Sequence, residues 1–167
     1  IKYGYIAGEK RFFFVAAILD VYDRMVVDYH IGYSCTGKEA ASALEGALQI
    51  RSIEFGGTMP DIRTDNGPQF VSEAFEEQCK LKGLVHECIP VKTPNKNAHV
   101  EAFHSILEEE CLSRYEFRSF SEAYLTVMAW INFYNHRRIH GSLQFQTPAE
   151  YHEACLKKTA SPVPIKL

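Results

Sequence analysis

The sequence predicts an α/β fold in which helices flank a mixed β-sheet. Three segments rich in β-branched and aromatic residues open the chain, and segments with a helical spacing of apolar residues follow them. Two short strand candidates lie between the helices. A run of strands followed by alternating helices and strands is typical of an α/β sandwich, and 167 residues suit a single domain.

The opening segments predict an antiparallel meander. Residues 2–7 alternate weakly between apolar and polar side chains and end at a turn-like Ala-Gly-Glu-Lys sequence. Residues 11–19 form an apolar, aromatic run that is typical of a strand buried on both faces. A polar break at residues 20–24 separates this run from a β-branched strand at residues 25–33. Short turns between three strands favour antiparallel pairing.

Caps and apolar spacing predict the remaining elements. Thr36 and Glu39 resemble a capping box, and we expect the helix that they begin to end at Gly56-Gly57. Gly83 closes a second helix. The expected elements after the first helix are a short strand at 60–64, a helix at 72–82, a short strand at 84–89, a polar loop at 90–97, helices at 98–112 and 121–133, and a linker-like tail from 159.

Composition excludes several classes of protein. Hydrophobic residues make up 46% of the chain and charged residues 23%, a balance that argues against disorder. The longest apolar run, residues 12–19, is too short to cross a membrane, so no membrane partner is expected. The five cysteines include no C-x-x-C pair, which indicates free thiols in a cytoplasmic protein rather than disulfides or a zinc site. A net charge of -3 restricts any nucleic-acid binding to a local patch.

Two carboxylates are distinguished by their positions. Asp65 follows a short strand and begins the sequence Asp-Asn-Gly-Pro-Gln-Phe, and Glu101 lies in the first turns of a later helix, with 35 residues between the two. Taken singly, Asp65 is typical of a turn and Glu101 of a solvated helix face. As a pair at one end of a sheet they suit Mg²⁺, which prefers oxygen ligands and binds through one or two carboxylates and a substrate phosphate.

These motifs resemble the D-D-35-E catalytic core of retroviral integrases and insertion-sequence transposases. The resemblance lies in T-D-N-G-x-Q-F at Asp65, in N-x-x-V-E-x-F-H-x-x-L-x-x-E-C around Glu101, and in W-I-x-F-Y-N-H-R-R-I-H-G-S-L from Trp130, followed by T-P-A-E-Y. The last two motifs are similar to the transposase branch. The resemblance covers residues 1–152, leaves 153–167 as a tail, and implies an RNase H-like fold with a five-stranded mixed sheet flanked by helices.

The same resemblance implies a DNA transposase that cleaves and joins DNA strands with Mg²⁺ or Mn²⁺. Asp65 and Glu101 would be catalytic and metal-binding, and two ions are expected with a complete set of three carboxylates. A metal-bound water would cleave at a transposon end, and the resulting 3′-OH would attack the target DNA. The family's first Asp precedes a segment like Ile1-Lys2-Tyr3, so we expect it just before residue 1 of a longer chain, and we expect the isolated chain to be inactive. Asp20 belongs to a segment similar to the family's L-D-x-x-S-R, with Asp23 in place of Ser, and that segment is not a catalytic position.

Polar residues near the two carboxylates are candidates for DNA contacts, although each also suits a solvated loop or helix end. Asn66 and Gln69 would orient Asp65 or touch DNA, and the lysines of the 90–97 loop would bind phosphates. His104 suits a packed or surface histidine better than a partner of the site. The complete set of expected DNA-binding residues is Asn66, Gln69, Lys92, Lys96, Asn97, His99, Arg137 and Arg138.

The resemblance also implies partners. We expect a homodimer, and an upstream helix-turn-helix region that binds transposon ends near the bacterial nucleoid. Two other functions stay open at this point. An RNase H-like metal nuclease would hydrolyse DNA without joining it to a target. A degenerate core would bind DNA or partners without metal, and its activity would not depend on Asp65 or Glu101.

Overall fold

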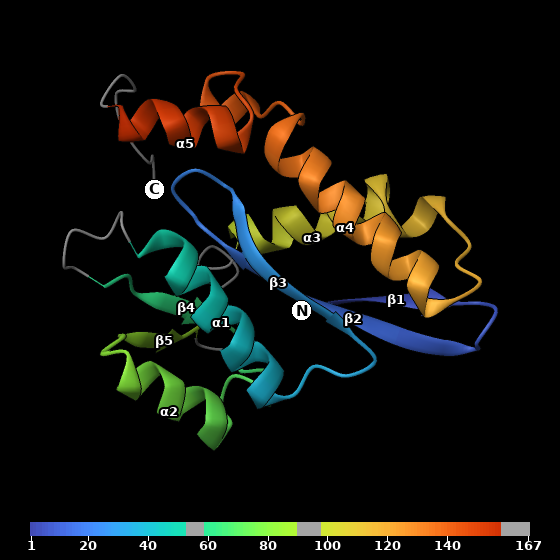
Figure 1. Ribbon diagram of the computed structural model, residues 1–167, viewed down its shortest axis with the longest axis horizontal. Coiled ribbons are helices and arrows are strands. Elements are labelled where there is room, and N and C mark those ends of the chain that lie inside the picture. The colour runs from blue at the N-terminus through green and yellow to red at the C-terminus, as the bar shows by residue number, and fades with distance from the viewer. Residues whose placement is uncertain (53–58, 90–97, 158–167) are drawn as a thin grey trace.

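The computed structural model describes residues 1–52, 59–89 and 98–157. Figure 1 shows the first three strands near the centre of the molecule, with helices both above and below them. In chain order the elements are β1 (Lys2–Ile6), β2 (Arg11–Leu19), β3 (Val26–Gly32), α1 (Gly37–Arg51), β4 (Ile62–Thr64), α2 (Glu73–Leu81), β5 (His86–Cys88), α3 (Ala98–Glu110), η2 (Leu112–Arg114), α4 (Phe120–His136), η3 (Gly141–Leu143) and α5 (Pro148–Leu156).

The first three strands confirm the predicted antiparallel meander. β2 pairs with β1 on one side and with β3 on the other, and Gly4 lies opposite Phe13. Side chains alternate between the two faces of a strand, and Phe13 and Val15 both enter the core that the sheet shares with α3 and α4. A Cβ on Gly4 would stand 2.4 Å from a ring carbon of Phe13, so glycine lets this ring lie across β1.

The expected five-stranded sheet is corrected to two smaller sheets in the described residues. β4 and β5 form a separate parallel pair, with Ile62 opposite His86 and Thr64 opposite Cys88. β4 is only three residues long, and within the described ranges its ladder is with β5 alone. Helix α1 links the two units, because it contacts β2 and β3 on one side and α2 on the other. The mixture of parallel and antiparallel strands is therefore as predicted, but the described strands form two sheets rather than one.

Most helix boundaries lie close to their predicted positions. The backbone N–H of Thr36 donates to Glu39 Oε2 (2.5 Å) at the start of α1, as the capping box predicts. α1 ends at Arg51, and the expected stop at Gly56-Gly57 lies outside the described residues. α2 ends before Gly83, which adopts a left-handed backbone with φ of 66°.

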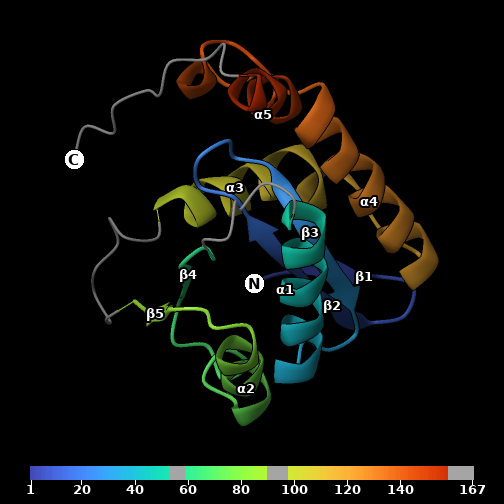
Figure 2. The same ribbon diagram turned by 60° about the vertical axis from the view of Figure 1, so that its left-hand side comes forward.

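Helix α5 was not predicted as a separate helix. The Thr147 hydroxyl accepts a hydrogen bond from the backbone N–H of Glu150, the Glu150 carboxylate accepts one from the N–H of Thr147, and Pro148 is the first helical residue. This capping box satisfies backbone donors that would otherwise be left without partners. α5 continues to Leu156, and Figure 2 shows it beside the end of α4.

Two apolar cores hold the helices against the strands. The larger core packs α3 and α4 on the meander and includes Phe103 and Leu107 of α3. The smaller core packs α1 and α2 around Ile62 of β4. Burial of one large apolar side chain contributes about 1.5–3 kcal/mol. The cores thereby fix the two elements that carry the candidate carboxylates, the end of β4 and the first turns of α3. Among the described residues, no helix is long and apolar enough to cross a membrane.

Candidate active site

Asp65 lies in an exposed turn directly after β4. Its Oδ1 accepts a hydrogen bond from the backbone N–H of Gly67 (2.9 Å), which fixes the direction of the carboxylate. A Cβ on Gly67 would stand 2.2 Å from Gln69 Nε2 and 2.9 Å from Asp65 Oδ1, so glycine allows the amide and the carboxylate to close around this turn. The turn interpretation of the sequence is thus correct for one oxygen, while the side chain as a whole stays accessible to a ligand.

Asn66 connects this turn to the neighbouring strand. Its Nδ2 donates to the carbonyl oxygen of Ile89, just beyond β5, at 2.8 Å. The structure therefore gives Asn66 a direct part in holding Asp65 at the paired ends of β4 and β5. A contact between Asn66 or Gln69 and DNA stays a prediction.

Glu101 occupies the first turn of α3, and its side chain is exposed. Phe103 and Leu107 anchor the opposite side of the helix in the core. His104 lies three residues after Glu101, and residues at this spacing share one face of a helix. α3 thus presents Glu101 and His104 in the same general direction.

His104 reports that this face of α3 is close to Asp65. The pKa of His104 is lowered to about 4, mainly by burial and further by the positive charges of the Ile1 amino group and Lys2, while the negative charge of Asp65 opposes this shift. Burial also lowers the pKa of the Ile1 amino group, while Asp65 raises it. Asp65, His104 and the start of β1 therefore lie within electrostatic range of one another, and Glu101 stands one helical turn before His104 on α3. The burial of His104 agrees with the packed histidine that the sequence favoured.

The donor set of this region agrees in kind with Mg²⁺ or Mn²⁺. Asp65 and Glu101 offer exposed carboxylate oxygens, which are the ligands that these hard cations prefer. No cluster of three or more histidine, cysteine, aspartate or glutamate side chains arranged for a metal ion occurs within residues 1–52, 59–89 and 98–157. Two carboxylates suffice for one ion that also binds substrate phosphate, and two ions need a further ligand.

Of the expected DNA-binding residues on the last helices, Arg138 has a clear partner in the protein. Its Nη2 lies 2.9 Å from Glu110 Oε1, and its Nε lies 3.0 Å from both oxygens of the same carboxylate. This forked ion pair ties the end of α4 to the end of α3. Arg137, the next residue toward the helix, is exposed. A DNA contact stays a prediction for both arginines.

The other expected contacts divide between described and undescribed residues. Lys92, Lys96 and Asn97 lie outside the described residues. His99 is exposed in the first turn of α3, and its pKa is lowered by partial burial and by the charges of Arg24 and Arg63. These two arginines were not among the expected site residues. Arg63, two residues before Asp65 in the chain, forms an ion pair with Glu87, with its Nη2 2.9 Å from Glu87 Oε2.

Asp20 and Asp23 have structural partners. Asp20 Oδ1 accepts a hydrogen bond from the N–H of Tyr22 (2.8 Å) within the turn between β2 and β3. Asp23 is buried, and its Oδ2 lies 2.7 Å from Arg51 Nη2 and 2.8 Å from His152 Nδ1. That this segment is not catalytic stays a prediction.

Comparison with known proteins identifies the family to which this chain belongs. A family model described as "Integrase core domain" matches residues 1–94, and a second model with the same description matches residues 82–148. The chain belongs to the integrase core domain family of insertion-sequence transposases and integrases.

Individual relatives agree with this assignment. The chain is 28% identical over 150 residues to the transposase for insertion sequence element IS629 of Shigella sonnei, covering 90% of this chain and 49% of that protein. It is 29% identical over 134 residues to a 31.7 kDa protein of insertion element IS407 of Burkholderia multivorans, covering 80% of this chain and 47% of that protein. The chain thus spans about half the length of these relatives.

Solved structures support the fold. The HTLV-2 integrase catalytic core domain in complex with magnesium superposes with a TM-score of 0.66 at 19% identity, covering 90% of each chain. The catalytic core domain of BIV integrase gives a TM-score of 0.57 at 19% identity, covering 95% of each chain. The α/β, RNase H-like class predicted from the sequence is therefore confirmed.

Proposed function

We propose that this chain is the catalytic domain of a DNA transposase that cleaves DNA strands and transfers the new ends to a target. The observation that carries the proposal is the convergence of Asp65, the face of α3 that bears Glu101 and His104, and the start of β1. Family membership and the resemblance of the two motifs support it.

The residues of this region have distinct parts in the proposed reaction. Asp65, oriented by the N–H of Gly67, and Glu101, carried by a helix anchored in the core, would hold Mg²⁺ or Mn²⁺. When bound, the divalent ions supply Lewis-acid stabilisation of the attacking and leaving oxygens at a phosphodiester. Asn66 keeps the Asp65 turn against β5. His104 stays neutral at physiological pH because burial lowers its pKa to about 4, so it adds no charge beside the carboxylates.

We propose that the third carboxylate belongs to the residue that precedes Ile1 in the full protein. The Ile1 amino group lies within the electrostatic reach of Asp65, so a residue joined to that nitrogen would be placed next to the Asp65 turn. An aspartate there would complete a set of three carboxylates and accommodate two ions. The 167-residue chain alone is then expected to be inactive.

The experiment is a strand-transfer assay with Mg²⁺, a pre-cleaved transposon end and a target plasmid. The chain extended by one N-terminal Asp is expected to join the end to the target, and the chain extended by Asn is expected to be inactive. In the Asp-extended background, Asp65→Asn and Glu101→Gln should each abolish joining. Asp61→Asn, an exposed carboxylate near β4, and Glu109→Gln, an exposed carboxylate of α3, are matched controls that should retain it.

Each outcome of this assay bears on the proposal. Joined product that requires Asp65 and Glu101 supports a transposase. Cleavage without joining would indicate a hydrolytic nuclease instead. DNA binding without either reaction, unchanged in both variants, would indicate a degenerate core.

The assembly and location of the protein belong to the same proposal. We propose a homodimer that acts on transposon ends and target DNA in the bacterial cytoplasm, near the nucleoid. An upstream helix-turn-helix region in the longer protein would recognise the transposon ends, which leaves the chain with a net charge of -3 free of that task.

A further inference from the structure

A groove of about 520 Å³ lies beside the open edge of strand β1. Residues of β1 line it together with Phe12 of β2, Glu108 of α3 and the segment around Tyr115. Within the described residues, β2 is the only strand that forms a ladder with β1, so β1 is an edge strand of its sheet. The groove and the unpaired edge therefore coincide.

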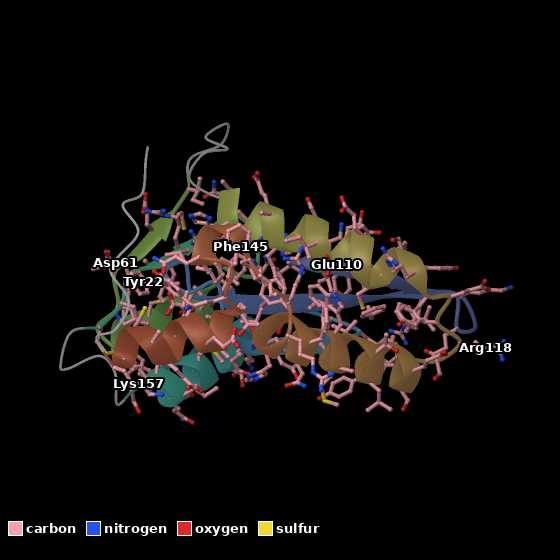
Figure 3. The ribbon with its side chains drawn as sticks, turned by 90° about the horizontal axis from the view of Figure 1, so that it is seen from above. Tyr22, Asp61, Glu110, Arg118, Phe145 and Lys157 are labelled. Carbon is pink, nitrogen blue, oxygen red and sulfur yellow. The ribbon has the colours of Figure 1, made fainter. Side chains whose placement is uncertain are left out.

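The edge of β1 directs backbone groups into this groove. In an antiparallel ladder, every second residue points its N–H and C=O groups at the partner strand, and the residues between them point theirs away. One end of the edge is closed, because Phe117 forms a bridge with Ile6 and the N–H of Gly8 donates to the carbonyl oxygen of Phe117 (3.3 Å). Figure 3 labels Arg118, whose backbone lies against Gly8 at this closed end. The earlier part of β1 is left as an unpaired stretch of strand.

The two faces of the sheet give the groove two chemically different walls. Tyr3 and Tyr5 project from one face together with Phe12, and the three side chains are 60%, 48% and 51% exposed. The ring centroid of Phe12 lies 5.5 Å from that of Tyr3 and 5.1 Å from that of Tyr5. Lys2 projects from the opposite face, because successive residues of a strand alternate, and its Nζ lies 2.9 Å from Glu108 Oε2. One wall is therefore aromatic, and the other carries charge.

The charged wall is acidic. The lining contains one lysine and two glutamates, Lys2, Glu108 and Glu116. Because Lys2 pairs with Glu108, the exposed carboxylate of Glu116 is left as the net charge of the lining. This wall repels the phosphates of a nucleic acid and attracts lysine or arginine side chains.

These features together select an extended polypeptide as the occupant. A polypeptide strand supplies N–H and C=O groups at the spacing of the β1 edge, and its side chains alternate between the two walls. DNA has no such backbone groups and would bring phosphates to the acidic wall. A second copy of this chain, paired antiparallel through β1, would bring its own Glu108 and Glu116 to the same face of the sheet, where like charges are unfavourable.

We propose that an extended segment of a partner protein adds to the edge of β1 as a further strand. Its apolar side chains would contact the wall of Tyr3, Tyr5 and Phe12, and its lysine or arginine side chains would contact the wall of Glu116. Main-chain hydrogen bonds supply affinity in this mode of recognition, and the alternation of side chains supplies specificity. The inference does not rest on the proposed function, because neither metal nor DNA takes part in the binding.

The test measures binding of short fluorescein-labelled peptides to the 167-residue chain by anisotropy. A peptide that alternates valine and lysine is expected to bind saturably, and to slow amide hydrogen exchange in β1. Two further peptides are N-methylated, one at every valine and the other at every lysine. Only one of them should lose affinity, by about tenfold or more, because the N–H groups of alternate residues point to opposite edges of a strand. This comparison leaves the protein itself unchanged.

Protein variants test the two walls separately. Tyr5→Ala is expected to raise the Kd of the valine–lysine peptide about 5- to 30-fold, as the loss of an aromatic anchor does. Glu116→Lys should weaken that peptide about threefold or more and strengthen a peptide that alternates valine and glutamate. Glu77→Lys is the matched control, because Glu77 is an exposed glutamate of α2 and the net charge changes equally. It should leave both Kd values unchanged.

Several results would overturn the inference. They are an absence of saturable peptide binding, an equal response to the two N-methylated peptides, and unchanged hydrogen exchange in β1. Binding of a labelled DNA duplex that Tyr5→Ala weakens as strongly as it weakens the peptide would assign the groove to DNA instead. A fall in the sedimenting mass of the chain alone on Tyr5→Ala would assign it to a second copy.

Discussion

Asp23 and Arg51 form a buried ion pair that offers a direct test of how this fold is held together. Asp23 belongs to the turn between β2 and β3, Arg51 ends α1, and His152 of α5 contacts the same carboxylate oxygen. Asp23 is 1% exposed and Arg51 is 5% exposed. We therefore consider Asp23→Asn, which keeps the shape of the side chain and removes its charge.

The expected loss of stability arises because Asp23→Asn leaves the Arg51 charge buried without its ionised partner. Removing one partner of a buried pair typically costs about 3–5 kcal/mol, because the other charge stays desolvated. Asp20 lies 3.8 Å from Arg51 Nη2 and is one-third exposed, so it offsets part of this loss. We expect Asp23→Asn to lower the free energy of unfolding by about 3 kcal/mol. Arg51→Met should cost a similar amount, and the double variant much less than the sum of the two.

The pH dependence of the stability lost in Arg51→Met gives a second, independent test of the buried ion pair. Burial raises the pKa of Asp23, Asp20 raises it further, and Arg51 opposes them. An acid whose pKa is higher in the folded state is less costly to bury once it is protonated. Loss of Arg51 raises that pKa again, so the destabilisation of Arg51→Met should shrink as the pH falls through the folded pKa toward the ordinary value of 3.8.

Urea unfolding followed by the fluorescence of Trp130, the single tryptophan and 8% exposed, measures these effects. Glu153→Gln is the control, because its ion pair with Lys157 on α5 is about 70% exposed on both sides and should contribute less than about 0.5 kcal/mol. A loss below about 1 kcal/mol for Asp23→Asn, or additive losses in the double variant, would refute the reasoning.

Two further stability predictions use the same urea assay. Burial lowers the pKa of both His104 and His140 to about 4, against an ordinary value of 6.5. Between pH 6.5 and 4 the unfolded chain therefore takes up protons that the folded chain does not, and the free energy of unfolding should fall as the pH drops. Replacing both histidines with Gln should flatten this pH dependence. An unchanged pH dependence would contradict the lowered pKa values of the two histidines. The Asn135 side chain accepts a hydrogen bond from the N–H of Val26 (2.9 Å) and donates one to the carbonyl oxygen of Val26 (2.8 Å). Asn135→Ala should lower the free energy of unfolding by about 3 kcal/mol, because it leaves two buried backbone groups without partners. A loss below about 1 kcal/mol would mean that water replaces the amide.

The sequence predicted those parts of the fold that depend on local chemistry. The meander follows from apolar runs separated by short polar breaks, and α1 follows from the capping box at Thr36 and Glu39. The capping box at Thr147 and Glu150 is an equally local signal, but it was not used, and α5 was not predicted. The separation of the sheet was not predictable in this way, because the pairing of the three-residue β4 is decided by which strand lies beside it.

In the candidate site, too, local features were predictable from the sequence and contacts between distant residues were not. Asp65 and Glu101 became candidates because two ordered motifs carry them, and the turn at Gly67 was predictable because its residues are adjacent in the chain. The partners of charged residues were not, because they come from distant positions. Arg138 meets Glu110 across 28 residues, and Asp23 meets Arg51 across the same separation.

Three aspartates in polar breaks or turns show why structure was needed to separate ligand candidates from structural charges. Asp20, Asp23 and Asp65 all lie in the short segments that follow strands, although their sequence neighbours differ. Asp23 accepts from the N–H of Met25 with one oxygen and meets Arg51 with the other, so both oxygens are committed within the protein. A cation needs accessible oxygen lone pairs, and Asp65, in an exposed turn with one backbone hydrogen bond on Oδ1, offers them. An ionised carboxylate is stable in the interior only with a partner such as Arg51, whereas a carboxylate that binds an external ion must stay accessible to it. By this criterion the structure separates Asp65 from Asp23 as a candidate ligand, independently of the motif in which it lies.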